Sequence, residues 1–173
     1  MSTARPRAKA SELEVRTLDG KTWTLSEQDP VNYTMVVFYR GLHCPVCKTY
    51  LGELDSKVEA FNERGTDVIA VSCDTRERAQ QTVKRWGIKH LTIAYGLSTE
   101  RAQEWGLYIS KAIKDDEPDR FCEPGFMLIN PDGTLYAAAI QSMPFARPHF
   151  KEILAAIDFV VENNYPARGE AAE

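Results

Sequence analysis

The chain has 173 residues, of which 43% are hydrophobic and 27% are charged, and its formal net charge is -4. This length fits one ordinary domain with a full core, and the acidic balance argues against a nucleic-acid partner, because phosphate binding needs a basic face. No apolar stretch approaches a membrane span and the first residues carry no apolar run typical of a secretion signal, so we expect a cytoplasmic protein without a membrane partner.

Strand-like and helix-like segments alternate along most of the sequence. Continuous apolar runs rich in β-branched residues predict buried strands, and apolar residues at helical spacing predict helices bounded by capping residues and glycines. In chain order we expect a hairpin at 14–25, a strand at 33–40, a helix at 44–65, a strand at 67–74, a helix at 75–87, a strand at 91–96, a helix at 98–106, a polar loop at 110–125, a hairpin at 126–141 and a closing helix at 146–163.

This order predicts the fold class. Alternating strands and helices favour a parallel sheet, and the late hairpin adds antiparallel strands, so we expect an α/β domain with a mixed central sheet, helices on both faces and an N-terminal β-hairpin. The predicted organisation is a flexible N-terminal tail at 1–11, a single domain at 12–165 and a C-terminal tail at 166–173.

The sequence CPVC, from Cys44 to Cys47, lies where a buried strand gives way to a helix. The unpaired N–H groups and partial positive charge of a helix N-terminus favour a thiolate, and this spacing lets the two sulfur atoms meet. Close cysteines in a reducing compartment indicate redox chemistry or metal binding rather than a structural staple. The remaining cysteines and histidines form no second ligand pair for zinc, so we expect a redox pair with no metal and no organic cofactor; two buried apolar residues are the other alternative.

With these elements in order, the chain resembles the alkyl hydroperoxide reductase and thiol-specific antioxidant (AhpC/TSA) family of peroxiredoxin-like proteins, which have a thioredoxin fold. The resemblance spans about 13–160. It rests on LDGKTWTLSE at 18–27, VVFYRGLHCPVCKTYLGEL at 36–54, VIAVSCD at 68–74 and FMLINPDGTL at 126–135.

The family's motif P-x-x-x-T-x-x-C, which ends on the peroxide-reducing cysteine, falls on this chain with that cysteine at Cys47. Its threonine position holds Cys44, its proline position holds Arg40, and Glu123 stands at the family's later arginine. The threonine and arginine orient peroxide and stabilise charge as the O–O bond breaks. The resemblance therefore implies that Cys47 attacks peroxide, and we expect Arg40 or Arg120 to supply the missing guanidinium.

A second resemblance, to the thioredoxin active site, reverses the roles of the two cysteines. There the first cysteine, here Cys44, attacks a target disulfide, and the second, here Cys47, resolves the mixed disulfide. Thioredoxin-like proteins also place a cis-proline opposite the pair, and the resemblance assigns that position to Pro124. The buried acid beneath the second cysteine of thioredoxins is replaced by Val37 or Phe38.

Three further residues have alternative roles. His43 either supports a thiolate when protonated or is a solvated loop residue. Cys122 is either a third redox thiol near the pair or an incidental loop cysteine, and Cys73 is expected to be a core residue.

The predicted function is that of a thiol-dependent antioxidant oxidoreductase, which reduces peroxides through a Cys44–Cys47 dithiol and disulfide. The alternatives are a protein disulfide exchange enzyme and a non-enzymatic module that senses oxidation or binds a partner. Turnover needs an external electron source, which the resemblance suggests is a thioredoxin or glutathione system, and homodimers are common in the family that the chain resembles.

Overall fold

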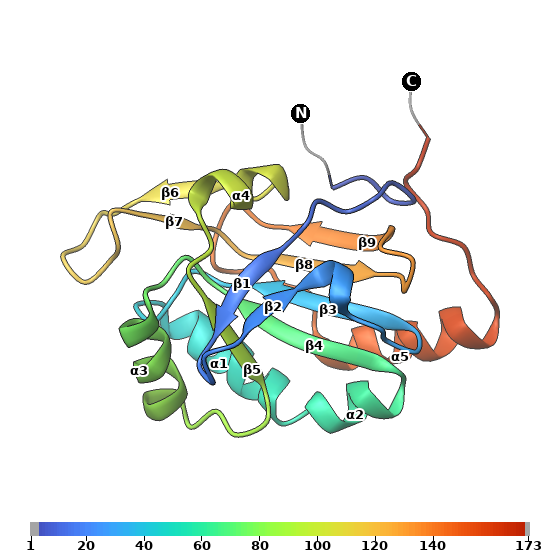
Figure 1. The fold of residues 1–173 in the computed structure, drawn as a ribbon, viewed down its shortest axis with the longest axis horizontal. Helices are drawn as coiled ribbons and strands as arrows, with labels where there is room; N and C mark the ends of the chain where they lie inside the picture. Colours follow the sequence, from blue (N-terminus) through green and yellow to red (C-terminus); the bar gives the residue numbers. More distant parts are fainter. Residues whose placement is uncertain (1–3, 172–173) are drawn as a thin grey trace.

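A seven-stranded mixed sheet runs through the computed structural model, which describes residues 4–171 (Figure 1). The strands are β1 (Glu14–Thr17), β2 (Thr22–Thr24), β3 (Tyr33–Phe38), β4 (Thr66–Val71), β5 (Thr92–Tyr95), β6 (Ile109–Lys111), β7 (Arg120–Cys122), β8 (Gly125–Ile129) and β9 (Leu135–Ile140). The sheet has the order β2-β1-β5-β4-β3-β8-β9, while β6 and β7 form a separate two-stranded sheet. Strands β3, β4 and β5 are parallel, and the others are antiparallel to their neighbours.

Helices cover both faces of the sheet. They are α1 (Pro45–Asp55), α2 (Val58–Glu63), α3 (Arg76–Trp86), α4 (Thr99–Glu104) and α5 (Phe150–Glu162), with a 3₁₀ turn, η1 (Leu25–Glu27). Side chains from α1, α2, α3 and α5 share one hydrophobic cluster with Met35 and Val37 of β3. The alternate residues Val36 and Phe38 face a second cluster, which contains Ala102 of α4 and Cys122 of β7.

The register of β3 determines where the cysteine pair lies. All six residues of β3 are buried, as expected for a central strand. Phe38 at its end lies beside Val71 at the end of β4 and beside Gly125 at the start of β8. The loops that follow β3 and β4 and the segment that precedes β8 therefore meet at one edge of the sheet.

The structure confirms most of the predicted elements, including the N-terminal hairpin, and corrects two. The predicted helix at 44–65 is two helices, α1 and α2, because Ser56 ends the first and its hydroxyl donates to the carbonyl of Glu53 at 2.6 Å. The predicted polar loop at 110–125 contains the β6–β7 hairpin. The segment looks like a loop in the sequence because it is rich in charged residues, yet Phe121 and Cys122 are buried, with exposed fractions of 1% and 0%.

The two predicted tails lie beside each other in the described part of the chain. The N–H of Arg7 donates to Leu135 at 2.8 Å, and its guanidinium donates to the carbonyl of Ala167 at 3.0 Å. Arg5 donates to the carbonyl of Glu170 at 3.0 Å. Residues 4–11 therefore extend along β9 rather than forming a free tail, and Figure 1 shows both terminal segments on the same side of the domain. The outermost parts of the predicted tails, 1–3 and 172–173, lie outside the described residues.

Candidate active site

Cys44 and Cys47 lie together at the N-terminus of α1. Cys44 is the N-cap residue, with extended backbone angles, and its sulfur accepts a hydrogen bond from the backbone N–H of Cys47 at 3.2 Å. Pro45 occupies the first helical turn, where its missing N–H costs nothing. Both thiols are reduced, and the two residues are 1% and 0% exposed.

Asp74, which follows the end of β4, holds in place the loop that precedes Cys44. This buried carboxylate accepts the N–H of Leu42 at 2.9 Å and pairs with Arg78 at 3.0 Å. Gly41 has a φ of +133°, and a Cβ atom at this position would lie 2.7 Å from a carboxylate oxygen of Asp74. Only glycine allows the loop to pass this close to the carboxylate.

Arg147 brings a guanidinium to the cysteine pair from the segment before α5. Its Nη2 atom lies 3.0 Å from the Cys47 sulfur and 4.0 Å from the Cys44 sulfur. The side chain is held in place because Nε donates to the carbonyl of Pro144 at 2.6 Å and the guanidinium stacks 5.0 Å from the ring centre of Tyr50. Its Nη1 atom is buried and has no hydrogen-bond partner among residues 4–171.

Arg40 supplies a second guanidinium, and Glu123 orients it. Arg40 Nε donates to Glu123 at 3.0 Å, and the Ser110 hydroxyl donates to the other carboxylate oxygen at 2.6 Å. The guanidinium lies 4.9 Å from the ring centre of Phe121, and it lowers the pKa of Cys44. Glu123 is 3% exposed, so water hardly solvates its carboxylate, and the hydrogen bonds from Arg40 and Ser110 stabilise its charge instead.

The hydrogen bonds around the pair distribute its charge unequally. The pKa of Cys44 is lowered to about 6 by the hydrogen bond from the Cys47 thiol, which outweighs burial, and then by the Cys47 N–H, Arg40 and Arg147. Burial and the hydrogen bond that it donates to Cys44 raise the pKa of Cys47 well above its ordinary value. Near neutral pH the pair therefore holds one proton and one negative charge, and the charge resides on Cys44.

Comparison with known proteins defines the family. The profile of the AhpC/TSA family matches residues 6–138. The chain belongs to the AhpC/TSA family. A 1-Cys peroxiredoxin from Medicago truncatula is 33% identical over 73 residues, which are 42% of this chain but only 33% of that protein.

Solved structures show the same fold. A peroxiredoxin-like protein from Aquifex aeolicus superposes with a TM-score of 0.74 and 17% identity, over 92% of this chain and 89% of the other. Peroxidoxin BcpB from Mycobacterium tuberculosis gives a TM-score of 0.73 and 14% identity, over 90% of this chain and 97% of the other. These likenesses confirm the predicted α/β thioredoxin-like fold.

Pro124 and His43 were predicted to support the cysteine pair, and the structure gives both residues surroundings that differ from those predicted. The cis-proline expected at Pro124 is wrong, because no cis peptide bond occurs among the described residues; its carbonyl accepts the N–H of Gln141 at 3.0 Å and extends the β8–β9 pairing. The His43 ring lies 4.6 Å from that of Phe121, and burial together with Arg40 lowers its pKa. The lowered pKa works against the first of the two alternatives for His43, support of a thiolate by a protonated ring, and the burial of both ring nitrogens disagrees with the second, a solvated loop residue.

The other two predicted supporting residues are Arg120 and Cys122. Arg120 is exposed on β7, where its charge interacts with that of Glu100. Cys122 is buried in the second hydrophobic cluster, whereas Cys44 and Cys47 belong to the first, on the opposite face of the sheet. Of its two alternatives, an incidental loop cysteine and a third redox thiol near the pair, the first does not describe it, because it is a fully buried strand residue.

Sequence reasoning missed Arg147 because it lies 100 residues beyond Cys47 along the chain. The signal available was weak: an arginine beside Pro148, just before the closing helix. The structure joins that position to α1, because the Tyr50 hydroxyl donates to the carbonyl of Pro148 at 2.7 Å and the Tyr50 ring lies 4.3 Å from that of Phe150.

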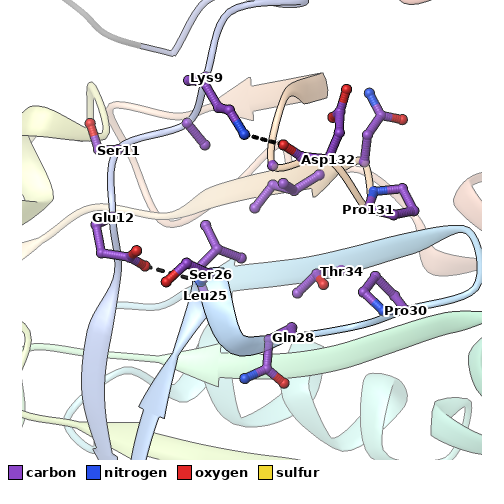
Figure 2. A pocket seen from close by; sticks show the side chains of 14 residues that line it. Lys9, Ser11, Glu12, Leu25, Ser26, Gln28, Pro30, Thr34, Pro131 and Asp132 are labelled. Atoms are coloured by element: carbon purple, nitrogen blue, oxygen red, sulfur yellow. Dashed lines mark hydrogen bonds between the residues drawn. The ribbon is translucent and has the colours of Figure 1, made fainter.

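A pocket of about 240 Å³ lies at the opposite edge of the sheet, beside the start of β3 and the β8–β9 turn (Figure 2). Its polar residues pair with one another: the N–H of Ser26 donates to Glu12 at 3.2 Å, and Lys9 donates to the carbonyl of Asp132. Its lining contains neither cysteine nor histidine, so the thiol chemistry belongs to the other edge.

Among residues 4–171, no group of three or more histidine, cysteine, aspartate or glutamate side chains is arranged to hold a metal ion. Within the same part of the chain, the helices are too short or too polar to span a bilayer.

Proposed function

We propose that this protein is a thiol peroxidase that reduces hydrogen peroxide or an organic hydroperoxide through Cys44 and Cys47. Membership of the AhpC/TSA family supports the reaction class. The observation that carries the proposal is the position of Cys44 at a helix N-terminus, where its sulfur accepts the N–H of Cys47 at 3.2 Å and Arg147 Nη2 lies within 4.0 Å of both sulfur atoms. The pKa of Cys44 is lowered in these surroundings. This arrangement provides a nucleophile, a resolving thiol and donors for the charge that develops on oxygen.

In the first step the Cys44 thiolate attacks the nearer oxygen of ROOH. The S–O bond forms as the O–O bond breaks, the sulfur is oxidised to the sulfenic acid, and the departing RO⁻ takes a proton from water to leave as ROH. The Nη2 atom of Arg147, 4.0 Å from the Cys44 sulfur, is the nearest guanidinium donor for the departing oxygen. Arg40 and Arg147 both lower the pKa of Cys44 and so keep it ionised before the attack.

In the second step the Cys47 sulfur attacks the sulfenic acid of Cys44. The S–S bond forms, the S–O bond breaks, and the hydroxyl leaves as water with the proton of the Cys47 thiol. The reacting atoms are already neighbours, because the Cys44 sulfur accepts the N–H of Cys47 at 3.2 Å and both sulfur atoms lie within 4.0 Å of Arg147 Nη2. We propose that a dithiol protein of the thioredoxin type or glutathione then returns two electrons and two protons to regenerate the pair.

This assignment reverses the roles that the AhpC/TSA resemblance implies. The family alignment puts the attacking cysteine at Cys47, and Arg147 Nη2 lies nearer to that sulfur, at 3.0 Å, than to Cys44, at 4.0 Å. Both residues are buried, but only the Cys44 sulfur accepts a helix N–H, and the pKa of Cys44 is lowered while that of Cys47 is raised. Because a thiolate is a much stronger nucleophile than a thiol, we propose that Cys44 leads and Cys47 resolves.

Trapping of the sulfenic acid tests this order. Reduced Cys47→Ser is treated with stoichiometric hydrogen peroxide in the presence of dimedone, and the adduct is located by peptide mass spectrometry. We expect a dimedone adduct on Cys44, no adduct on Cys47 of Cys44→Ser, and loss of NADPH-coupled peroxide turnover in both variants. An adduct on Cys47 of Cys44→Ser, without one on Cys44 of Cys47→Ser, would return the attacking role to Cys47.

One observation favours a second candidate function, protein disulfide exchange. Thioredoxin-type exchange requires a first cysteine that attacks as a thiolate and a buried second cysteine that stays protonated. The lowered pKa of Cys44 and the raised pKa of Cys47 follow this order. Reduction of insulin disulfides by the reduced protein, measured beside peroxide reduction, separates the two functions. We propose peroxide as the substrate, so we expect the peroxide reaction to be the faster by orders of magnitude. We further propose a cytoplasmic protein whose working unit is the domain at 12–165, alone or as a homodimer.

A further inference from the structure

A second pair of cysteines, Cys73 and Cys122, lies on the face of the sheet opposite to the first pair. Cys122 belongs to the second hydrophobic cluster, and Cys73 packs against that cluster. The Cys122 thiol donates to the carbonyl of Tyr39 at 3.5 Å, and the N–H of Tyr39 donates to the carbonyl of Val71, two residues before Cys73, at 3.0 Å. The sulfur of Cys122 therefore lies beside the segment at the end of β4 that carries Cys73, and the two thiols influence each other's pKa. The two residues are separated by about fifty positions in the sequence, and both are reduced.

The sheet edge brings this pair together. Cys73 follows the end of β4, and Cys122 is the last residue of β7. The hydrogen bonds of the antiparallel β6–β7 ladder fall at alternate residue pairs, which include those of Tyr108 and Ala112. Cys122 is paired with Ile109, and this pair has no hydrogen bonds, so the N–H of Cys122 points away from β6. That N–H is therefore free to donate to Cys73.

The pair has the same electrostatic asymmetry as Cys44 and Cys47. The neighbouring Cys122 thiol, and then the Cys122 N–H, lower the pKa of Cys73, against burial and the nearby charges of Asp74 and Glu100. The neighbouring Cys73 thiol and burial raise the pKa of Cys122 well above its ordinary value. Cys73 is also half-buried, whereas Cys122 is 0% exposed. A nucleophilic thiol that solvent can reach thus contacts a protonated, inaccessible partner.

We propose that Cys73 and Cys122 form a second redox-active thiol pair, which hydrogen peroxide converts into a disulfide. The Cys73 thiolate attacks peroxide, the S–O bond forms as the O–O bond breaks, and the products are the Cys73 sulfenic acid and hydroxide, which combines with the proton that Cys73 released to solvent when it ionised. The Cys122 sulfur then displaces the hydroxyl as water with its own proton, and the S–S bond forms. Each disulfide consumes one peroxide, and a dithiol reductant reverses it.

The disulfide would act on the hairpin that supports the first site. It joins the end of β4 to β7, one residue before Glu123, the carboxylate that orients Arg40. The Cys122 thiol also loses the hydrogen bond, 3.5 Å long, that it donates to the carbonyl of Tyr39 at the end of β3. Oxidation of the second pair therefore adds a covalent restraint between the hairpin and the sheet edge on which Cys44 is mounted.

Trypsin separates the relevant cysteines, which makes the test direct. Cleavage after lysine and arginine places Cys44 and Cys47 together in 41–48, Cys73 in 65–76, and Cys122 in 121–151, since the bond before Pro148 resists cleavage. The full chain with the double substitution Cys44→Ser/Cys47→Ser is reduced, treated with stoichiometric hydrogen peroxide, alkylated with iodoacetamide and digested without reductant. We expect peptides 65–76 and 121–151 joined by a disulfide, and an intact mass lower by two hydrogens.

Two further variants in that background assign the roles. Addition of Cys122→Ser should leave a sulfenic acid on Cys73 that dimedone traps, and addition of Cys73→Ser should leave Cys122 without any peroxide adduct. The same digest of the wild-type chain gives the answer even if the double variant is unstable. If Cys73 and Cys122 both remain fully alkylated by iodoacetamide under conditions that oxidise Cys44 and Cys47, the second pair is not redox-active. That result would leave the proposed peroxidase function intact.

Discussion

Substitution of Arg147 by glutamine removes a positive charge whose Nη2 atom lies 4.0 Å from the Cys44 sulfur. Two unit charges at that distance interact by about 1 kcal/mol in water and by about 4 kcal/mol at an effective dielectric constant of 20. Arg147 lowers the pKa of Cys44 less than Cys47 or Arg40 does, so we expect the lower end of this range. About 1.4 kcal/mol is about one pKa unit, which moves the pKa of Cys44 from about 6 to about 7.

The assay separates this change in ionisation from a loss of transition-state stabilisation. The rate of alkylation of Cys44 by iodoacetamide, measured against pH, reports the thiolate alone, and its midpoint should rise by about one unit in Arg147→Gln. Above pH 8 both proteins are ionised and should be alkylated equally fast. Peroxide reduction above pH 8 should still be about 10²-fold slower in the variant, because the donor to the departing oxygen is gone.

Two controls make the comparison specific. Arg147→Lys keeps the charge and should retain the midpoint of alkylation, while losing part of the peroxide rate because an ammonium group cannot reproduce the guanidinium geometry. Arg120→Gln removes an exposed arginine of β7 and should change neither measurement. An unchanged peroxide rate in Arg147→Gln above pH 8, with an unchanged alkylation midpoint, would refute the role given to Arg147.

Three other predictions follow from the surroundings of the site. Cys47→Ala removes the largest influence that lowers the pKa of Cys44, so its thiolate absorbance at 240 nm should titrate closer to the ordinary value of 9.0. Gly41→Ala should lower the free energy of unfolding in urea by about 1–3 kcal/mol, since it places Cβ against Asp74 in a strained backbone conformation; an unchanged midpoint would contradict the geometry. Burial would raise the pKa of Asp55, but hydrogen bonds from three backbone N–H groups lower it, so its stabilisation is present above the unfolded value of 3.8 and is lost as pH falls through the lower folded pKa. Asp55→Asn should therefore cost about 1 kcal/mol at pH 7 and progressively less below pH 3.8, and a cost independent of pH would count against this explanation.

Local sequence patterns determined the elements and the reactive motif. Thr75 is a good N-cap and accepts the N–H of Arg78, while Gly87 ends the same helix in the left-handed region, so α3 could be predicted almost residue by residue. The CPVC motif likewise predicted that one thiol would sit at a helix N-terminus, because a proline after the first cysteine favours the first turn of a helix. Such interactions are made between residues a few positions apart, so a single sequence contains them.

Which thiol carries the charge, and which groups stabilise it, was decided by tertiary structure. Arg147 reaches Cys47 only because Tyr50 of α1 is packed against the start of α5. Cys73 and Cys122 meet only because β4 and β7 end at the same edge of the molecule. These contacts join residues that are 50 to 100 positions apart, and their energy depends on distance in space and on burial, neither of which is encoded in local spacing.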